Sequence, residues 1–419
     1  MIIELHLLQN FAPSNLNRDD TGTPKNSEFG GYRRARISSQ CQKRAIRRMF
    51  PNYLYELGLA PDDLAERTRL VVNECVNRLV ATGKPEELAR TVVAVLLGGV
   101  NLKVEDDQTQ YLLFLGRREI ARLSELAVQH WDELAGIAKQ MDTAPSGTGK
   151  RNAKKGAAAL VPKPIKDAVL ACLDSGKAID LALFGRMVAD LPDVNCDAAC
   201  QVAHAVSTNT VNIEFDYYTA VEDLPSDNKP GAGMIGTVEF NSACYYRYAS
   251  VDLGQLMTNL QDDAQQCRKA LHAFIKAMIE AVPTGKQNTF AAHNPPSLIA
   301  VVIRHSGQWN LVNAFAKPIV PRGNQSLIEL SITALDDYWG RLTTMYGTKR
   351  LKGVWAVSSE AIQMPHLAQH TAIASKGTGE DVGEQGQRPL AFGEQLRAVD
   401  DLIERVMDAV ENAEPTGAA

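Results

Sequence analysis

The sequence has no long hydrophobic run and no regular set of cysteine pairs. Nowhere do about eighteen apolar residues follow one another, so no membrane-spanning helix is expected. The seven cysteines are odd in number and scattered, unlike those of small secreted proteins, which predicts free thiols in a reducing cytoplasm. The first residues have no basic stretch and include Glu4 and His6, so neither a signal peptide nor an anchor is expected.

The chain also lacks an overall positive charge. Its 419 residues carry a formal net charge of −5, with 45% hydrophobic and 22% charged residues. This composition is that of an ordinary folded chain, long enough for one elaborated domain or two to three smaller ones. Because the total charge is acidic, a site for a polyanion requires local segregation of positive charge.

Residues 31–48 provide such segregation, because they contain seven basic residues and no acidic one. Ser38 or Ser39 is a good N-cap for a helix that runs to about Phe50. At 100° per residue, the apolar side chains fall on one side of this helix. The opposite side carries only cations, namely Lys43, Arg44, Arg47 and Arg48. A polyanion lying along this side would remove their mutual repulsion, and the alternative is a basic surface that faces water.

Strands and helices alternate along the whole chain, without an internal repeat. Alternating residues predict a half-buried strand at 2–8, and a long loop follows at 10–31. Helical periodicity dominates from 61 to 141, including residues 64–72 and 111–138. We predict further strands at 181–188, 210–218, 237–248, 297–304 and 353–357, and further helices at 196–206, 262–282, 326–346 and 392–412.

Residues 143–166 form a second basic segment, biased towards glycine, alanine and proline and without acidic residues. Its cations are Lys150, Arg151, Lys154, Lys155, Lys163 and Lys166. This composition predicts a mobile cationic loop, and a solvated linker is the alternative.

Three motifs are similar to those of enzymes and cofactor-binding proteins, but each lacks either the required context or some of the required residues. Residues 231–236 fit the pattern G-x-G-x-x-G but precede a predicted strand, so we interpret them as the pliable end of a hairpin. The pairs Gly149-Lys150 and Gly285-Lys286 lack the other residues of a phosphate-binding P-loop. Cys196, Cys200 and His204 share one face of a predicted helix, where packing thiols are favoured over a zinc site.

Two acidic residues suggest a hydrolytic alternative. Asp19 and Asp20 lie in the long loop beside Arg18, and paired carboxylates can hold a divalent metal for ribonuclease chemistry. The sequence provides no third carboxylate for such a site. The structural alternative is that these residues form Asx turns that shape the loop.

A series of motifs in the order of one known family extends from residue 1 to about 357. The motifs are Asn15-Leu16-Asn17-Arg18-Asp19-Asp20, Phe29-Gly30-Gly31, Arg33-Arg34-Ala35-Arg36-Ile37-Ser38-Ser39-Gln40, Lys43-Arg44-Ala45, Gly185-Arg186-Met187, Tyr218-Thr219-Ala220-Val221-Glu222-Asp223-Leu224, Tyr246-Arg247-Tyr248-Ala249 and Ala291-Ala292-His293-Asn294-Pro295. Together they closely resemble the backbone subunit of the type I-E CRISPR Cascade complex, the CasC family.

The resemblance implies an α+β protein shaped from three parts. These are a modified RRM-like (ferredoxin-like) palm, a helical fingers domain and a β-hairpin thumb. The palm would comprise residues 1–60, 174–205 and 237–370, the fingers residues 61–173 with the basic loop, and the thumb residues 206–236. Residues 371–419 match no motif and are expected to be a flexible C-terminal extension.

The resemblance also implies roles for individual residues. The phosphates and sugars of a CRISPR RNA would be held by Arg18, Lys25, Ser38, Gln40, Lys43, Arg44 and Arg47. Met187 would project against the bases, and Tyr217, Tyr218 and Val221 would form a wedge in the thumb, with simple hairpin packing as the alternative. Target duplex would be gripped by Lys150, Arg151, Lys154, Lys155, Lys163 and Lys166.

The implied function is a non-enzymatic, cytoplasmic scaffold without cofactor or metal. Copies of the chain would polymerise along one CRISPR RNA, with other Cascade subunits, and present kinked, pre-ordered segments to target DNA. Specificity would then rest on base pairing. The competing hypothesis is a metal-dependent ribonuclease of a related CRISPR filament that uses Asp19 or Asp20.

Overall fold

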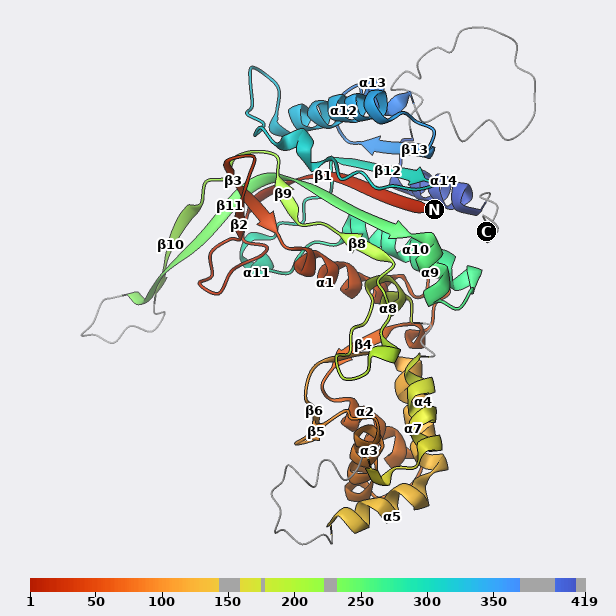
Figure 1. Cartoon of the computed structure of the whole chain (residues 1–419). Coiled ribbons are helices and arrows are strands. Elements are labelled where there is room, and N and C mark those ends of the chain that lie inside the picture. Colours follow the sequence, from red (N-terminus) through yellow and green to blue (C-terminus); the bar gives the residue numbers. More distant parts are fainter. Residues whose placement is uncertain (143–158, 175–177, 222–231, 370–395, 412–419) are drawn as a thin grey trace, which may run out of the picture. The chain divides into compact units, whose positions relative to one another are not determined.

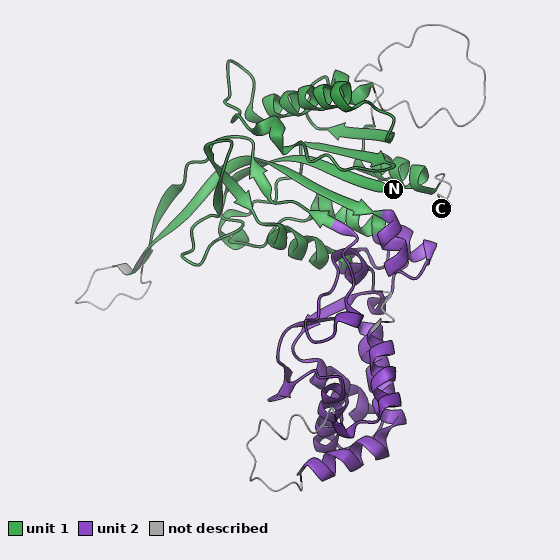
Figure 2. Ribbon diagram, viewed as in Figure 1, with its two compact units in different colours: residues 1–50, 201–252, 271–419 green, residues 51–200, 253–270 purple. Residues whose placement is uncertain are grey.

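The chain folds into two compact units that each combine several segments of the sequence. The computed structural model describes all residues except 143–158, 175–177, 222–231, 370–395 and 412–419 (Figure 1). Unit 1 comprises residues 1–50, 201–252 and 271–419, and unit 2 comprises residues 51–200 and 253–270 (Figure 2). No disulfide bond joins any of the seven cysteines, all of which lie in the described part of the chain. Within the described residues, no helix is long and apolar enough to cross a membrane.

Unit 1 is built on a sheet with the strand order β13-β12-β1-β11-β9-β3-β2, in which all neighbouring strands of this path are antiparallel. Two more strands, β8 and β10, pair with β11 beside this path. The strands are β1 (Ile2–Ser14), β2 (Asn26–Phe29), β3 (Tyr32–Ile37), β8 (Cys200–Val202), β9 (Ala205–Ser207), β10 (Glu214–Val221), β11 (Ala232–Asp252), β12 (Leu298–Arg304) and β13 (Leu351–Ser358). The central strand β1 runs antiparallel to both neighbours, with Leu5 opposite Ala249 and Val301.

Helices cover the sheet of unit 1. They are α1 (Ser39–Met49), the part of α10 (Ala264–Glu280) from residue 271 on, α11 (Gln287–Phe290), η4 (Leu311–Phe315), α12 (Leu327–Tyr346), α13 (Pro365–Ala368) and α14 (Val399–Glu411). In α12, Ile332 and Trp339 are fully buried against Val302 and Val354 of the sheet. The helix α12 lies on one side of the sheet and α1 on the other (Figure 1).

Unit 2 is mainly helical. Its helices are α2 (Val71–Ala81), α3 (Glu86–Gly99), α4 (Arg117–Gln129), α5 (Trp131–Asp142), α7 (Lys163–Asp174), α8 (Ile179–Phe184) and α9 (Leu253–Asn259). Short 3₁₀ turns occur at η1 (Phe50–Tyr53), η2 (Pro61–Asp63) and η3 (Pro192–Val194). Two small sheets pair β4 (Ala65–Thr68) with β7 (Leu113–Gly116) and β5 (Val104–Glu105) with β6 (Gln108–Thr109).

Most elements that are long and strongly periodic follow the sequence prediction. This holds for α1, the β10–β11 hairpin, α10, β12, α12, β13 and α14. The predicted combination of helices and strands is therefore confirmed at the level of fold class. The two units divide the chain after residues 50 and 200, and the division into palm, fingers and thumb stays a prediction.

Several short segments were predicted wrongly. Residues 181–188 begin in helix α8 instead of a strand, and residues 196–206 contain strands β8 and β9 instead of a helix. Residues 64–72 include strand β4, and 111–138 include strand β7. Short apolar runs fit either structure, so tertiary pairing decides them. The long loop is also shorter than expected, because β1 extends to Ser14 and β2 begins at Asn26.

Strand β1 was predicted to be half-buried, but it is buried on both faces. Glu4 and His6 are 0% and 1% exposed. The Glu4 carboxylate pairs with the Arg304 guanidinium and accepts a hydrogen bond from the Tyr248 hydroxyl. His6 Nδ1 lies 2.8 Å from the Tyr246 hydroxyl. Polar residues can therefore occupy a buried face where long-range partners satisfy them.

Candidate nucleic-acid interface

Helix α1 begins and packs as its sequence predicts. Ser38 is the N-cap, and its hydroxyl accepts a hydrogen bond of 3.3 Å from the backbone N–H of Cys41. The Ser38 N–H donates in turn to Asn17 Oδ1 at 2.9 Å, which ties the preceding loop to the start of the helix. Ile46 and Phe50 are fully buried beneath it. The other face of α1 is thus held towards the surface.

A polar network that the sequence did not reveal fastens α1 to the sheet. Gln42 is 2% exposed, and its Nε2 donates to the Ala203 carbonyl at 2.7 Å. The buried Arg247 donates to Gln42 Oε1, to Gln9 Oε1 and to the Met278 carbonyl. Burial lowers the pKa of Arg247 to about 10, so its guanidinium remains charged near neutral pH. The network restrains the cationic helix against rotation.

A groove of about 670 Å³ runs beside α1. It is lined by the loop at 16–22, by the helix stripe Cys41, Arg44, Ala45, Arg48 and Met49, and by residues 282–285. Gly285 approaches the loop so closely that a Cβ there would lie 2.3 Å from the Leu16 carbonyl oxygen. Only glycine permits this wall of the groove.

The groove concentrates positive charge from two segments of the chain. Arg18, from the loop, and Arg44 and Arg48, from the helix, are exposed along it. In the part of the chain that the structure describes, no ion pair neutralises these three guanidinium groups. A solvent-facing cation without an acidic partner is available to a phosphate.

The remaining predicted contacts of α1 lie on an adjoining stripe. Gln40 is exposed, and Lys43 and Arg47 are half-buried. Arg47 also has an interaction within the protein, so it is not a free charge. Lys25 is half-buried, and its backbone carbonyl accepts from the Arg36 N–H at 2.9 Å. The structure therefore gathers Arg18, Lys25, Ser38, Gln40, Lys43, Arg44 and Arg47 around one helix and its adjoining loop.

The cations near α1 also affect the pKa values of two neighbouring side chains, Cys41 and His204. Burial raises the pKa of the Cys41 thiol, and the charges of Lys25 and Arg44 act in the opposite direction. Burial lowers the pKa of His204, and Arg36 and Lys25 lower it further. His204 Nδ1 accepts a hydrogen bond of 3.2 Å from the backbone N–H of Ser39. A neutral imidazole thus supports the first turn of α1.

Arg34, one of the seven basic residues of 31–48, does not belong to the exposed basic surface. It is 0% exposed, and its two terminal nitrogens donate to the carbonyls of Ser207, Thr208, Phe315 and Ala316. Arg34 therefore links strands and loops inside unit 1. Arg36 is half-buried and donates to the Asn26 carbonyl at 3.4 Å, whereas Arg33 is exposed.

Asp19 stabilises a turn of the loop, and it is not part of a metal-binding cluster within the described residues. Asp19 Oδ1 accepts from the backbone N–H groups of Thr21 and Thr23, each at 3.0 Å, and from the Thr21 hydroxyl at 2.7 Å. These hydrogen bonds, led by that of Thr21, lower the pKa of Asp19. Asp20 is exposed in the same groove. Among the described residues, no group of three or more acidic, histidine or cysteine side chains is arranged to hold a metal.

The cysteine and histidine motif is likewise not a helical face. Cys196 forms an isolated bridge with Arg186, Cys200 begins β8, and His204 precedes β9. The predicted helix is absent from this segment, so the interpretation of thiols packing along it is wrong. Residues 232–236 belong to β11 of the hairpin, where Gly236 lies opposite Tyr218. Gly231 lies outside the described residues.

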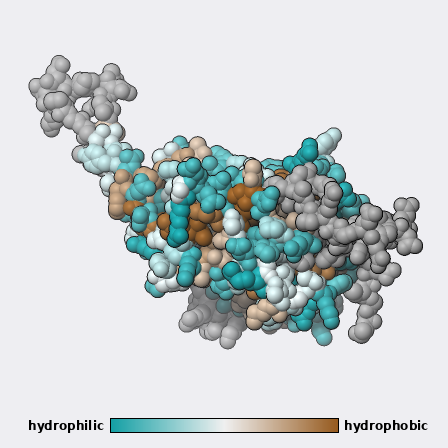
Figure 3. Space-filling model, turned by 90° about the horizontal axis from the view of Figure 1, so that it is seen from above, coloured by the Kyte–Doolittle hydropathy of each residue, from teal (hydrophilic) through white to brown (hydrophobic). Residues whose placement is uncertain are grey.

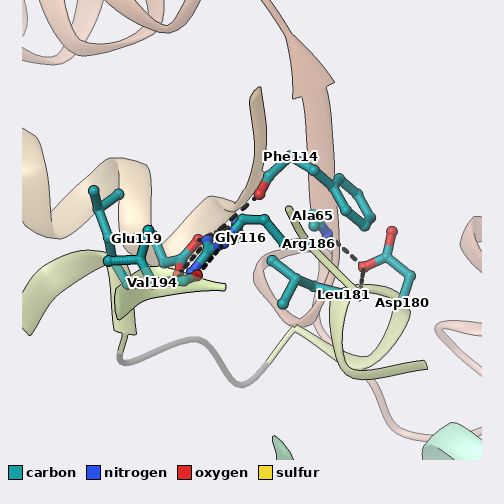
Figure 4. A network of polar contacts seen from close by, with 9 residues as sticks. Ala65, Phe114, Gly116, Glu119, Asp180, Leu181, Arg186 and Val194 are labelled. Atoms are coloured by element: carbon teal, nitrogen blue, oxygen red, sulfur yellow. Dashed lines mark hydrogen bonds and ion pairs between the residues drawn. The ribbon is translucent and has the colours of Figure 1, made fainter. Parts of the chain in front are cut away.

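Met187 belongs to unit 2, and its side chain is 86% exposed. Its neighbour Arg186 is buried and donates to both carboxylate oxygens of Glu119 at 2.9 Å (Figure 4). Arg186 also donates to the Val194 carbonyl at 3.0 Å. On the other side, the Val188 N–H donates to Asn195 Oδ1 at 2.6 Å. The backbone that carries Met187 is therefore anchored on both sides, while its side chain meets solvent.

The hairpin of β10 and β11 reaches away from the body of unit 1 (Figure 1), and Figure 3 shows the same arm at the upper left of the molecule. Tyr217 and Tyr218 are 62% and 40% exposed, and Phe215 and Met234, which the sequence analysis did not identify, are 67% and 56% exposed. Successive residues of a strand point to opposite faces, so Tyr217 and Tyr218 lie on different faces of the hairpin. Val221 ends β10, and its side chain lies outside the described part.

The predicted cationic loop is only partly described. Lys150, Arg151, Lys154 and Lys155 lie outside the described residues. Lys163 and Lys166 belong to helix α7, so the prediction that they are part of a loop is wrong. The helix forms there because Ile165, Val169 and Leu173 supply an apolar face to the core of unit 2.

The chain is similar to known proteins over almost its whole length. A family model described as CT1975-like protein matches residues 3–380. A chain of a solved "CRISPR RNA-guided surveillance complex, pre-nicking" is 29% identical, with alignment over 98% of this chain and 100% of that chain and a TM-score of 0.77. A chain of a "CRISPR RNA-guided surveillance complex" is 24% identical, with coverages of 98% and 100% and a TM-score of 0.68, and shows similarity of fold. No protein of curated function matches the sequence.

Proposed function

Because this chain belongs to the CT1975-like protein family, we propose that it binds CRISPR RNA as the backbone subunit of a type I-E Cascade surveillance complex. The predicted resemblance to such a backbone subunit is confirmed by the family model and the similar structures. The observation that carries the proposal is the cationic surface of α1, which is anchored from below and bordered by a groove.

The two units correspond to the parts of a hand-shaped subunit. The sheet of unit 1 with its helices serves as an RRM-like (ferredoxin-like) palm, and the β10–β11 hairpin serves as the thumb. The helical unit 2 serves as the fingers. Support comes from the hairpin that leaves the sheet at β11 and from the predominance of helices in unit 2.

The phosphates and sugars of the guide lie along α1. Arg18, Arg44 and Arg48 line the groove, while Lys43 and Arg47 occupy the adjoining stripe. Lys25, Ser38 and Gln40 complete the surface near the start of the helix. Contacts of this kind are independent of base sequence, because every nucleotide carries the same phosphate. Arg48 is an addition to the contacts that the family resemblance implied.

The β10–β11 hairpin and Met187 set the positions of the guide's bases. An exposed tyrosine can occupy the stacking place of a displaced base, and Tyr217 and Tyr218 offer their rings on opposite faces of the hairpin. Val221 belongs to the same proposed wedge. Met187 meets the bases from an anchored backbone. The resulting kinked segments are ordered before the target arrives, which reduces the entropy lost on pairing.

The protein acts without catalysis of its own in this proposal. Asp19 uses its carboxylate in a turn that forms the groove, which supports a structural role for it. Copies of the chain assemble along one guide with other Cascade subunits, and target DNA pairs with the exposed bases. The cations Lys150, Arg151, Lys154 and Lys155, together with Lys163 and Lys166 at the start of α7, contact the target duplex.

Assembly on RNA tests the proposal directly. The chain is mixed with guide RNA, and the mass of the complex is measured for the parent and for a variant with Lys43→Glu, Arg44→Glu and Arg47→Glu. The parent is expected to form an RNA-dependent multimer, and the variant is expected to remain unassembled. The matched control is Arg322→Glu, an exposed cation away from the groove. Full assembly of the triple variant would refute the site.

Asp19→Ala and magnesium provide the control for the ribonuclease hypothesis. Labelled RNA complementary to the guide is incubated with the assembled complex. We expect the RNA to stay intact with the parent chain and with the Asp19→Ala variant. Regularly spaced products that disappear in the Asp19→Ala variant would show that the chain is an enzyme.

A further inference from the structure

A second pocket of unit 1 shares no residue with the α1 groove. It has a volume of about 440 Å³ and lies where the end of β12, the end of α12 and the start of β13 meet. Its described lining includes three cations, Arg304, Lys349 and Arg350, and two aromatic residues, Trp309 and Tyr346. None of the described residues that line it is acidic. The pocket therefore combines positive charge with flat aromatic surface.

Arg304 presents a donor that the protein leaves unused. Its side chain is almost wholly buried, its Nε donates to the Glu4 carboxylate, and its guanidinium carbon lies 3.7 Å from the centre of the Trp309 ring. The second terminal nitrogen, Nη2, is also buried but has no hydrogen-bond partner among the described residues. Buried charged donors are almost always paired, so Arg304 is an exception in the wall of this pocket.

Tyr346 offers the stacking surface. Its side chain is 64% exposed, whereas one face of Trp309 is occupied by Arg304. The rings of Trp309 and Tyr346 are 5.7 Å apart and inclined at 51°, so Trp309 supports Tyr346 from the side. Gly307 and Gly347, with φ of 80° and 75°, turn the backbone without adding side chains at the rim. Arg350 Nη1 lies near this rim, 3.6 Å from where a Cβ on Gly307 would be.

A simpler explanation for two of the cations is the helix end. Lys349 and Arg350 follow the C-terminus of α12, where cations offset the negative end of the helix dipole. This explanation does not extend to Arg304, which comes from β12 and whose Nε pairs with the Glu4 carboxylate. It also does not account for the exposed aromatic ring beside the cations.

We propose that this pocket binds one unpaired nucleotide, with the base stacked on Tyr346 and the phosphate held by the exposed Lys349 and Arg350. A nucleotide matches both halves of the pocket, because its base is flat and its phosphate supplies several acceptor oxygens. An acidic peptide side chain offers a single carboxylate to the two exposed cations, Lys349 and Arg350. The site is separate from the α1 groove and contributes a second contact to single-stranded nucleic acid.

Titration of the full chain with AMP tests the proposal by calorimetry. All proteins carry Arg18→Gln, Arg44→Gln and Arg48→Gln, so that the α1 groove does not contribute and the two sites are judged separately. Tyr346→Ala is expected to weaken AMP binding about tenfold, because a stacked base is worth ~1–3 kcal/mol. Lys349→Glu with Arg350→Glu is expected to abolish it. Met345→Ala, an exposed neighbour outside the pocket, is the matched control.

Three comparisons decide between nucleotide and other ligands. Adenosine and inorganic phosphate are each expected to bind at least tenfold more weakly than AMP. Equal binding of phosphate and AMP, or tighter binding of an Asp-Phe dipeptide, would overturn the proposal. It would also fail if the pocket variants lowered the melting temperature but left AMP binding unchanged, because the cations would then serve only the end of α12.

Discussion

The salt dependence of RNA binding should fall when the three groove cations are neutralised. Arg18, Arg44 and Arg48 come from two segments, line one groove and have no ion pair among the described residues. Each phosphate that such a cation neutralises releases counterions, which changes the slope of log K against log salt by about 0.7 for a single strand. The variant with all three arginines changed to glutamine should therefore have a slope smaller by about 2.

This slope difference has a measurable consequence. Between about 50 and 200 mM salt, a slope difference of about 2 corresponds to roughly 20-fold. The parent should thus lose about 20-fold more affinity than the variant over this range. Asp20→Asn provides a test with the opposite sign, because it removes a negative charge from the same groove and should raise affinity at low salt.

Fluorescence anisotropy with a labelled single-stranded RNA measures the slopes. Exposed substitutions of this kind change folding stability by less than about 0.5 kcal/mol, so the melting temperatures should agree. Arg322→Gln, an exposed position outside the groove, should keep the parental slope. If the triple variant and the parent lose affinity in parallel, phosphate does not lie on these arginines and the reasoning is refuted.

Three further predictions concern the anchoring elements. Glu119→Gln leaves Arg186 buried without its counter-charge, so the free energy of unfolding, measured with urea, should fall by about 3–5 kcal/mol. The double variant Glu119→Leu with Arg186→Met should restore most of this free energy. If it restores none, the pairing is contradicted. Burial lowers the pKa of His6 to about 3, so the folded state binds this proton less tightly than the unfolded state, and stability should fall as pH decreases from 6.5 towards 3, by on the order of 5 kcal/mol. His6→Gln should flatten this part of the stability curve, and an unchanged curve would exclude His6 as its source. Gly236→Ala would bring a Cβ to 2.5 Å from the Tyr218 ring, so it should displace the ring. RNA-dependent assembly should then be impaired, while the affinity of the α1 groove for RNA stays the same. Normal assembly would show that the position of Tyr218 is unimportant.

The cationic helix could be predicted because its signals are local. The cap at Ser38, the periodic apolar residues and the absence of acids all lie within about one dozen residues of sequence, and α1 follows them closely. Gln42 and Arg34 could not be predicted in the same way. Both satisfy their polar groups with backbone carbonyls more than one hundred residues away, so their burial depends on contacts that no local pattern contains.

The region from 181 to 206 shows the same limit for secondary structure. Its apolar runs are short, and a short run fits a strand or a buried helix equally well. Helix α8 is held in place by Asp180, whose carboxylate accepts a hydrogen bond of 2.8 Å from the Ala65 N–H. Strand β9 is selected by pairing with both β3 and β11. The partner segments, rather than the local residues, therefore decide these elements.

The sequence by itself determined the family, the order of the long elements and the presence of a basic helix face, because motifs, caps and periodicity act over short distances along the chain. The tertiary structure decided which cations reach the surface. It buried Arg34 and Arg304, exposed Arg18, Arg44 and Arg48 along one groove, and separated Tyr217 from Tyr218 across a hairpin. Burial and hydrogen bonding between distant segments set the availability of a charge, and these exist only in the folded chain.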